Sequence, residues 1–282
     1  MLDTQAFDTM VIVMSVRAVF FDLGDTLIFQ AHEPGRERLV AAMTAQARPL
    51  LQSWGAAPGV DLTSLLGELH DAVAAAQPLR RAAGLEVDGP FITQGALAAY
   101  GIDATTGQAR ALFAAIAVDP ATWGWQTYPD TIDTLQRLRS TSTPVAIVSN
   151  GWYTSDVQSA RMERLGIRRD LYEAFVTSAD VMHPKPHPAS FQRALDALGV
   201  DAGEAIFVGD DPHADVRGAK ALGMSTVWKL NGRYEVPPAQ DADYTIHDLW
   251  ELFTLGVLPQ QAEAELPLES LTPHEDDNAG RY

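Results

Sequence analysis

The stretch Val16–Phe29, VRAVFFDLGDTLIF, contains the feature around which the rest of the chain is organised. Its residues 18–21 form a short run of apolar, β-branched and aromatic side chains, which is typical of a buried strand. The run stops at Asp22, and a loop over residues 23–26 follows before apolar residues resume. A carboxylate at the carboxyl end of a buried strand lies where open α/β sheets bind their ligands. Asp22 is therefore a candidate functional residue, and the alternative is an aspartate that only begins a turn.

The sequence between residues 128 and 255 alternates between strands and helices. Buried strands are expected at residues 145–148, 174–177, 205–208 and 225–228, with a further short strand at 244–246 and a last helix at 247–255. The helices between the strands carry apolar stripes and end at glycines, namely Gly166, Gly199 and Gly223. Strands that alternate with helices require right-handed crossovers. The pattern predicts an α/β fold with a doubly wound, Rossmann-like parallel sheet.

The pattern changes between about residues 30 and 125, which are rich in Ala and show helical periodicity without a convincing strand. Apolar side chains follow steps of three and four residues in three stripes. Asp61 is placed to cap the second stripe, and Thr105 with Gln108 forms a capping-box pattern ahead of the third. We expect residues 30–125 to form an all-helical domain, inserted into a core domain made of residues 16–29 and 126–258.

The composition excludes several classes of partner and chemistry. The formal net charge of −17 argues against a nucleic acid polymer or an anionic membrane as the partner. The chain has no Cys, which excludes disulfides and thiol nucleophiles and is compatible with the reducing cytoplasm, where we expect the protein. Residues 1–15 lack a basic start, so we expect an extension that is neither a signal peptide nor a membrane span. Residues 259–282 hold six acidic residues and one Arg, which indicates a solvated, disordered tail.

Polar residues gather at or just after the expected carboxyl ends of the strands. They are Asp22 and Asp25, then Ser149 and Asn150, then Lys185, and finally Asp210, Asp211 and Asp215. In a doubly wound sheet these ends converge on one crevice. Several carboxylates repel one another unless a cation compensates them, and hard oxygen ligands suit Mg²⁺. A lysine and a hydroxyl beside that metal would hold a phosphate, and an aspartate there is able to attack phosphorus to form an aspartyl-phosphate.

Four segments resemble the motifs of the haloacid dehalogenase-like (HAD) superfamily, in the subfamily with a helical cap inserted after the first motif. FFDLGDTL resembles the nucleophile motif, VAIVSN the second motif, HPKPHPASF the third and FVGDDPHADVRGAKALGM the fourth. The match covers roughly residues 16–250. The set is specific because all four segments occur in this order and spacing. The fold it implies is a Rossmann-like core with an inserted helical cap.

The resemblance implies roles for the residues of the first three motifs. Asp22 would be the nucleophile and a metal ligand. Lys185 would neutralise the transferring phosphoryl group and orient Asp22. Ser149, Asn150 and the adjacent Gly151 would bind that phosphoryl group. The implied substrate is a small phosphorylated molecule.

The resemblance also implies a Mg²⁺ site. Asp210 would be a ligand beside Asp22, with Asp211 or Asp215 helping directly or through water. The backbone carbonyl of Gly24 would supply the third protein oxygen.

One position departs from the family's phosphatases, which usually carry a second Asp two residues after the nucleophile as general acid and base. Here that position is Gly24, and an Asp follows one residue later, at Asp25. General acid–base catalysis is worth ~10²–10⁴-fold in rate. Asp25 is the candidate to replace the missing acid, and its alternative role is to fix the loop by accepting backbone N–H bonds.

Three functions stay open on these residues. The favoured one is a Mg²⁺-dependent phosphatase of a small phosphorylated metabolite. The true haloacid dehalogenases also lack the second Asp, direct the Asp nucleophile at carbon and need no metal, but the acidic fourth motif argues against them, because carboxylates crowded without a cation would oppose an ionised nucleophile. The third function is a HAD-like binding or regulatory protein with little turnover.

Recognition of the leaving group is expected at the start of the helical domain, close to Asp22. His32, Arg36 and Arg38 are the polar candidates there, and their alternative is a solvated helix face. Trp123 and Trp125 lie near the return to the core, where packing or hinge roles are favoured over contact with the substrate.

Overall fold

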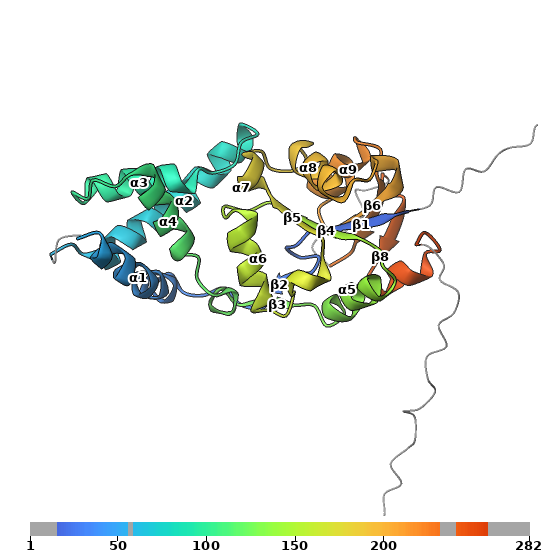
Figure 1. The fold of residues 1–282 in the computed structure, drawn as a ribbon, viewed down its shortest axis with the longest axis horizontal. Helices are drawn as coiled ribbons and strands as arrows, with labels where there is room; N and C mark the ends of the chain where they lie inside the picture. The colour runs from blue at the N-terminus through green and yellow to red at the C-terminus, as the bar shows by residue number, and fades with distance from the viewer. Residues whose placement is uncertain (1–15, 56–58, 232–240, 259–282) are drawn as a thin grey trace, which may run out of the picture.

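A computed structural model describes residues 16–55, 59–231 and 241–258, and the expected terminal extension and acidic tail lie outside these residues (Figure 1). A six-stranded parallel sheet runs in the order β5-β4-β1-β6-β7-β8. The strands are β1 (Ala18–Phe21), β4 (Val145–Ser149), β5 (Ala174–Thr177), β6 (Ala205–Gly209), β7 (Ser225–Lys229) and β8 (Tyr244–Ile246). The predicted doubly wound α/β fold is confirmed.

The first strand lies in the middle of the sheet, where Phe21 is in register with Ile147 of β4 and Val208 of β6. Both faces of the sheet are covered. The first face is packed by α5 (Thr131–Ser140), α6 (Ser155–Glu163) and η5 (Leu249–Thr254), and the second by α8 (Ala189–Leu198) and α9 (Gly218–Lys220). A strand buried on both faces reads as a continuous apolar run, which is why residues 18–21 are recognisable in the sequence.

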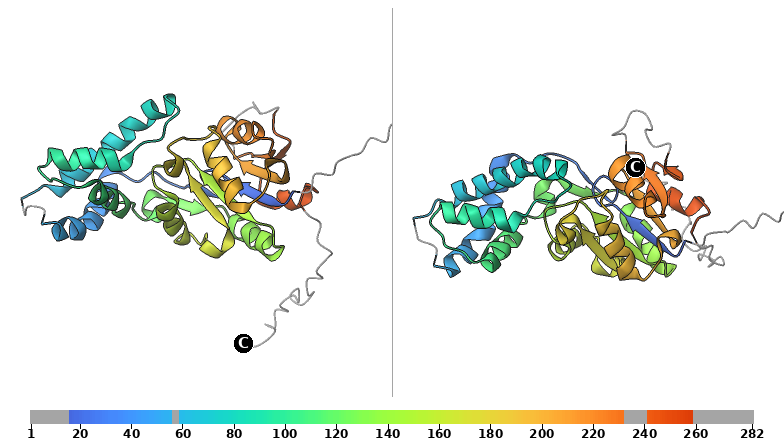
Figure 2. Two further views of the ribbon diagram at one scale, coloured as in Figure 1. Left: turned by 45° about the horizontal axis from the view of Figure 1, so that its top comes forward. Right: turned by 90° about the horizontal axis from the view of Figure 1, so that it is seen from above.

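Four helices form a group of their own beside the sheet (Figures 1 and 2). They are α1 (Arg36–Ser53), α2 (Leu62–Ala82), α3 (Gly89–Ala99) and α4 (Thr106–Ala115). Their apolar stripes meet in a separate hydrophobic cluster that includes Leu65 and Leu112. Asp61 caps α2, and Thr105 with Gln108 forms the expected capping box at α4. No helix in the described part of the chain is both long and apolar enough to span a bilayer.

The connection between the helical group and the sheet is a short antiparallel ribbon. It pairs β2 (Ile28–Gln30) with β3 (Trp125–Thr127), and Gln30 is opposite Trp125. The expectation of no strand from about residue 30 to the return to the core was therefore wrong at its two ends, where Gln30 and Trp125 belong to strands. Strands of three residues are too short to leave a recognisable alternation in the sequence.

The helix expected after β6 begins as a π-helix, η4 (Pro212–Arg217), before it continues as α9. The expected last helix is a 3₁₀-helix, η5. The remaining short elements are η1 (Pro120–Trp123), η2 (Arg169–Leu171), α7 (Ser178–Val181) and η3 (Ala202–Glu204). Single π turns are frequent at functional sites because they change the direction of side chains within a helix. Here η4 lies directly after the strand end that carries the acidic fourth motif.

Candidate active site

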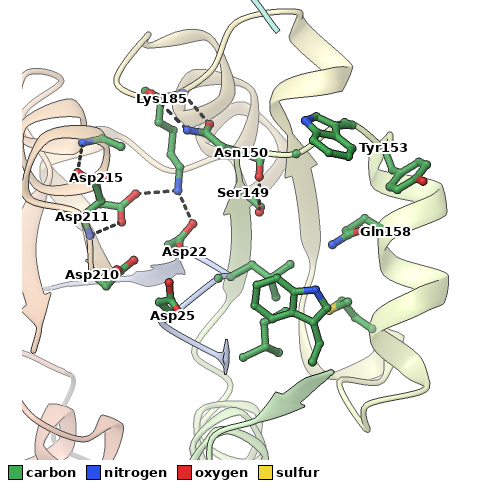
Figure 3. Close-up of a pocket in the computed structure, with 18 of the residues that line it drawn as sticks. Asp22, Asp25, Ser149, Asn150, Tyr153, Gln158, Lys185, Asp210, Asp211 and Asp215 are labelled. Atoms are coloured by element: carbon green, nitrogen blue, oxygen red, sulfur yellow. Dashed lines mark hydrogen bonds and ion pairs between the residues drawn. The ribbon is translucent and has the colours of Figure 1, made fainter. Parts of the chain in front are cut away.

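Residues from four separate segments meet at the carboxyl edge of the sheet (Figure 3). Asp22 follows β1, Ser149 ends β4, Asp210 follows β6, and Lys185 reaches in from the loop before α8. All four side chains are buried. They line one pocket together with Asp215 of η4. The convergence expected of parallel strand ends therefore occurs in the structure.

Lys185 is the central cation of this group. Its Nζ lies 2.6 Å from Oδ1 of Asp22 and 2.7 Å from Oδ1 of Asp215 (Figure 3). It also donates to the carbonyl of Val148 at 2.8 Å. Burial acts to lower the pKa of Lys185, but the carboxylates of Asp215 and Asp22 outweigh it and raise that pKa above its usual value. The lysine is therefore held protonated between two acids.

Three carboxylates share this one lysine. Asp22, Asp210 and Asp215 each present an oxygen, and the three oxygens lie within 4.8 Å of one another. Burial, with repulsion from Asp22 and Asp215, raises the pKa of Asp210. Burial also raises the pKa of Asp215, even though Lys185 opposes it. A buried cluster with two uncompensated negative charges and only oxygen donors fits a hard divalent cation such as Mg²⁺.

The two consecutive acids of the fourth motif have different positions. Oδ1 of Asp211 accepts hydrogen bonds from the backbone N–H groups of His213 and Ala214, at 2.8 and 2.9 Å, and so caps η4. Its carboxylate is not part of the three-oxygen cluster, which Asp215 completes. Gly209 permits this arrangement, because a Cβ on it would lie 2.4 Å from Oδ2 of Asp215.

The second-motif residues also divide their roles. Ser149 lines the pocket, but the side chain of Asn150 holds the lysine loop: its Oδ1 accepts from the backbone N–H of Lys185 at 2.7 Å. The N–H of Gly151 donates to Oγ of Ser178 at 2.8 Å. Asn150 therefore positions Lys185, a role that the sequence did not indicate, and in this conformation the N–H of Gly151 is bound within the protein.

The loop after the nucleophile places Gly24 and Asp25 in the same pocket. Asp25 has a φ of 59°, in the left-handed region that Asp tolerates better than most residues, and its N–H donates to the carbonyl of Ile28 at 2.6 Å. Figure 3 shows the Asp25 side chain beside Asp22 and Asp210. Gly24 faces open space, with no atom within 4 Å of the position a Cβ would take.

Two further residues hold Asp210, and sequence reasoning missed both. Nδ2 of Asn231 donates to Oδ2 of Asp210 at 3.0 Å, and Nε1 of Trp228 donates to its backbone carbonyl at 2.8 Å. Trp228 lies in β7 and Asn231 follows that strand, so the neighbouring strand positions this acid. A motif confined to β6 and η4 contains no signal for them.

The opposite wall of the pocket comes from α2, from η1 and β3, from the loop after β4 and from α6. It consists of Gln77, Arg81, Trp123, Trp125, Trp152, Tyr153, Gln158, Arg161 and Met162. Of these, the sequence had singled out only Trp123 and Trp125, and for packing. The three residues expected to meet the leaving group, His32, Arg36 and Arg38, do not line the pocket. Arg36 instead pairs with Asp71 on α2, at 2.7 Å.

A buried contact joins the helical group to the core beside the pocket. Glu86, in the loop after α2, accepts a 2.5 Å hydrogen bond from Oγ of Ser178, the residue that binds Gly151. The backbone N–H of Glu86 also donates to the carbonyl of Met182 at 2.9 Å. Glu86 and Ser178 are both fully buried. The position of the helical group is therefore linked by hydrogen bonds to the loop that follows Asn150.

Comparison with known proteins places the chain among relatives of two activities. The glyceraldehyde 3-phosphate phosphatase of Methanocaldococcus jannaschii is 35% identical over 126 residues, which is 44% of this chain and 54% of that protein. The (S)-2-haloacid dehalogenase 4A of Burkholderia cepacia is 32% identical over 135 residues, 46% of this chain and 56% of that protein. The chain thus spans about half the length of the curated relatives it matches.

Solved structures resemble the chain over most of its length. A HAD phosphatase from Thermococcus onnurineus is 27% identical, with a TM-score of 0.50, over 86% of this chain and 99% of that one. A 2-haloacid dehalogenase from Pseudomonas syringae pv. Tomato DC3000 is 25% identical, with a TM-score of 0.54, over 85% of this chain and 97% of that one. Residues 16–223 match the family model of the haloacid dehalogenase-like hydrolases. The chain belongs to this family of hydrolases.

Proposed function

We propose that this hydrolase is a Mg²⁺-dependent phosphatase, which cleaves a small phosphorylated metabolite through an aspartyl-phosphate on Asp22. The observation that carries the proposal is the Lys185 ammonium held between Asp22 and Asp215, with a third buried carboxylate, Asp210, beside them. One lysine compensates one of three charges. The two negative charges that remain call for a divalent cation. Lys185 and that cation together then suit a dianionic phosphate.

Asp22, Asp210 and Asp215 would hold the cation, and Gly24, which lines the same pocket, would add its carbonyl. When bound, Mg²⁺ supplies charge stabilisation for the phosphoryl oxygens. The fit rests on donor chemistry, because carboxylate oxygens are the ligands that Mg²⁺ takes in proteins. Asp211 is expected to stay in its capping role.

The chain's own residues then account for two displacements at phosphorus. A carboxylate oxygen of Asp22 attacks phosphorus, the ester P–O bond breaks, and the leaving oxygen departs with the bonding pair and takes up a proton. Water next attacks the same phosphorus and gives a proton to the group that protonated the leaving oxygen, the bond between phosphorus and Asp22 breaks, and inorganic phosphate leaves with the carboxylate restored. Lys185 fixes Oδ1 of Asp22 and lies close enough to neutralise the transferring group, and Ser149 offers it a hydroxyl donor.

Asp25 is the proposed proton donor to the leaving oxygen. Its side chain lies in the pocket beside Asp22, which supports this role even though it is one residue beyond the usual position of the acid. An aryl leaving group needs little protonation, so activity on aryl phosphates is expected to be independent of Asp25.

A second candidate function is hydrolysis of 2-haloacids, which Gly24 and the likeness to named dehalogenases favour. The same nucleophile would then attack carbon and release halide without a metal. The cluster of three buried acids opposes it, because a site without a cation leaves Asp22 facing two like charges. A binding or regulatory protein with little turnover is the third candidate.

The experiment that separates the three is hydrolysis of p-nitrophenyl phosphate with and without Mg²⁺, beside Asp22→Asn. The proposal predicts turnover that requires Mg²⁺ and is lost in Asp22→Asn. Release of halide from 2-chloropropionate in the presence of chelator would support the dehalogenase instead. Binding of Mg²⁺ by calorimetry without turnover of either compound would support the binding protein.

A further inference from the structure

The pocket has two chemically different ends. Among the described residues, every carboxylate that lines it comes from the loop after β1, the residues directly after β6 or η4, which form its acidic end (Asp22, Asp25, Asp210, Asp211 and Asp215). The wall contributed by α2, α6 and the loop after β4 includes no acidic residue among those the structure describes. Its polar members form the donor end, Gln77, Arg81, Trp152, Gln158 and Arg161.

Gln158 is fixed as a donor. Its Oε1 accepts a hydrogen bond from Nη1 of Arg161 at 2.6 Å, and Arg161 is itself held by a bond from its Nε to the carbonyl of Val118 at 3.0 Å. Because the amide oxygen is turned toward Arg161, the amide nitrogen faces the pocket. Figure 3 shows this side chain extending from α6 into the cavity. A ligand atom that meets this amide nitrogen accepts a hydrogen bond from it.

Arg81 brings a positive charge from the helical group. With its amide oxygen turned toward them, Gln77 accepts from Nη2 of Arg81 at 3.1 Å and from Nε1 of Trp152 at 3.2 Å. In the described part of the chain, no carboxylate lies within ion-pair distance of Arg81 or Arg161. Two guanidinium groups without an acidic ion-pair partner therefore line one pocket, on the wall away from its carboxylates.

A guanidinium beside an amide donor is suited to an oxyanion, because both present N–H groups to its lone pairs. We propose that the leaving group of the substrate carries a second oxyanion, a carboxylate or another phosphate, which Arg81 and Gln158 bind. This inference rests on the proposed phosphatase function, which places the transferring phosphate at the acidic end. Trp123 and Trp125 then line the space between the two anions and contact the carbon skeleton.

Three phosphate esters with a two-carbon skeleton test this directly. They are ethylene glycol monophosphate, whose free end is a neutral hydroxyl, 2-phosphoglycolate, which ends in a carboxylate, and ethylene glycol bisphosphate, which ends in a second phosphate. A hydrogen bond to a charged group is strong enough to give about a 10- to 100-fold preference. The proposal predicts that preference in kcat/KM for one of the two anionic compounds, and the compound preferred identifies the oxyanion.

The variant Arg81→Met removes the charge and keeps the length of the side chain. It is expected to bring the ratio of kcat/KM values, anionic over neutral, close to one. Arg110→Met is the matched control: Arg110 is an exposed arginine of α4 that does not line the pocket, so the ratio is expected to stay at the wild-type value.

The results of these assays distinguish failure of the second-oxyanion proposal from failure of the proposed phosphatase function. Hydrolysis of aryl phosphate without a preference among the three esters would overturn the inference. A preference that persists in Arg81→Met would also overturn it. Both results are compatible with the proposed phosphatase function. If wild-type protein hydrolyses no phosphate ester in Mg²⁺, both proposals fall together.

Discussion

The two ends of the pocket differ in how the chain encodes them. The acidic end comes from side chains directly after β1 and β6, where a buried apolar run stops and a carboxylate follows. The donor end comes from the middle of α6 and the last turns of α2. Both segments lie more than 50 residues along the sequence from the nucleophile. The carboxylates proposed to carry the reaction thus come from segments that follow strand ends, whereas the residues proposed to bind the leaving group are brought to the pocket by tertiary packing.

The largest effect is expected from removing the cation that holds the acidic end together. In Lys185→Met the two carboxylates within 2.7 Å of Nζ lose their partner, and breaking a buried pair in this way lowers the free energy of unfolding by ~3–5 kcal/mol. Chemical denaturation of wild-type protein and Lys185→Met without Mg²⁺ measures this difference in the free energy of unfolding.

Lys220→Met is the matched control for this prediction, since Lys220 pairs with Asp243 at the surface, where an ion pair contributes ~0–1 kcal/mol. Equal losses of stability in the two variants would contradict the assigned importance of the buried pair.

The next effect concerns position 24, where the family's phosphatases usually carry an acid and this chain has Gly24. The position has open space, so Gly24→Asp should fold normally. General acid catalysis is worth ~10²–10⁴-fold, and the variant is expected to gain in kcat on alkyl phosphates if Asp25 is a poor substitute. Activity on aryl phosphates should change little, because their leaving group needs less protonation.

Steady-state kinetics on one alkyl and one aryl ester of phosphate decide the point. The matched variant Asp25→Asn should lose activity on the alkyl ester alone. A wild-type alkyl activity that Asp25→Asn leaves intact would show that another group donates the proton.

Binding of Mg²⁺ should stabilise the folded protein. A ligand at 100 times its Kd adds ~2.7 kcal/mol to the free energy of unfolding, which thermal denaturation reports as a higher Tm. Asp210→Asn is expected to abolish this response, because Asp210 presents one of the three clustered oxygens.

Asp211→Asn separates the two acids that the sequence could not distinguish. The carboxylate of Asp211 caps η4, so this variant should lose stability while it keeps the response to Mg²⁺. Loss of the response in Asp211→Asn alone would move the metal site to that residue.

The smallest effect lies at the contact between the helical group and the core. Glu86 and Ser178 form a buried hydrogen bond to a charged group, which is worth ~1.5–3 kcal/mol. A double-mutant cycle with Glu86→Ala and Ser178→Ala should therefore show a coupling energy of that size in the free energy of unfolding. Additive losses in the cycle would mean that the two side chains are stabilised by other neighbours.

The sequence identified the residues that local patterns mark. Asp22, Ser149 and Asp210 were recognisable because each ends a buried apolar run, and Asp61 and Thr105 because helix caps have fixed spacings. The same reasoning could not tell which acid of the fourth motif joins the cluster, since the π-helix η4 decides the direction of those side chains.

Residues held only by tertiary contacts left no pattern in the sequence. Asn231 reaches Asp210 from the end of a neighbouring strand, and Glu86 meets Ser178 across 92 residues of chain. Arg81 is one of many polar residues on a helix, and only the tertiary structure brings the end of α2 to the pocket. The residues expected to meet the leaving group, at the start of α1, do not line the pocket.

The central claim is that Asp22 becomes phosphorylated during turnover. The direct measurement is acid quenching of the enzyme during hydrolysis of p-nitrophenyl phosphate in Mg²⁺, followed by mass spectrometry of the peptide that carries Asp22. We expect a phosphoryl group on Asp22 in wild-type protein and none in Asp22→Asn. Steady turnover without a phosphoryl group on Asp22, or with one on another residue, would contradict it.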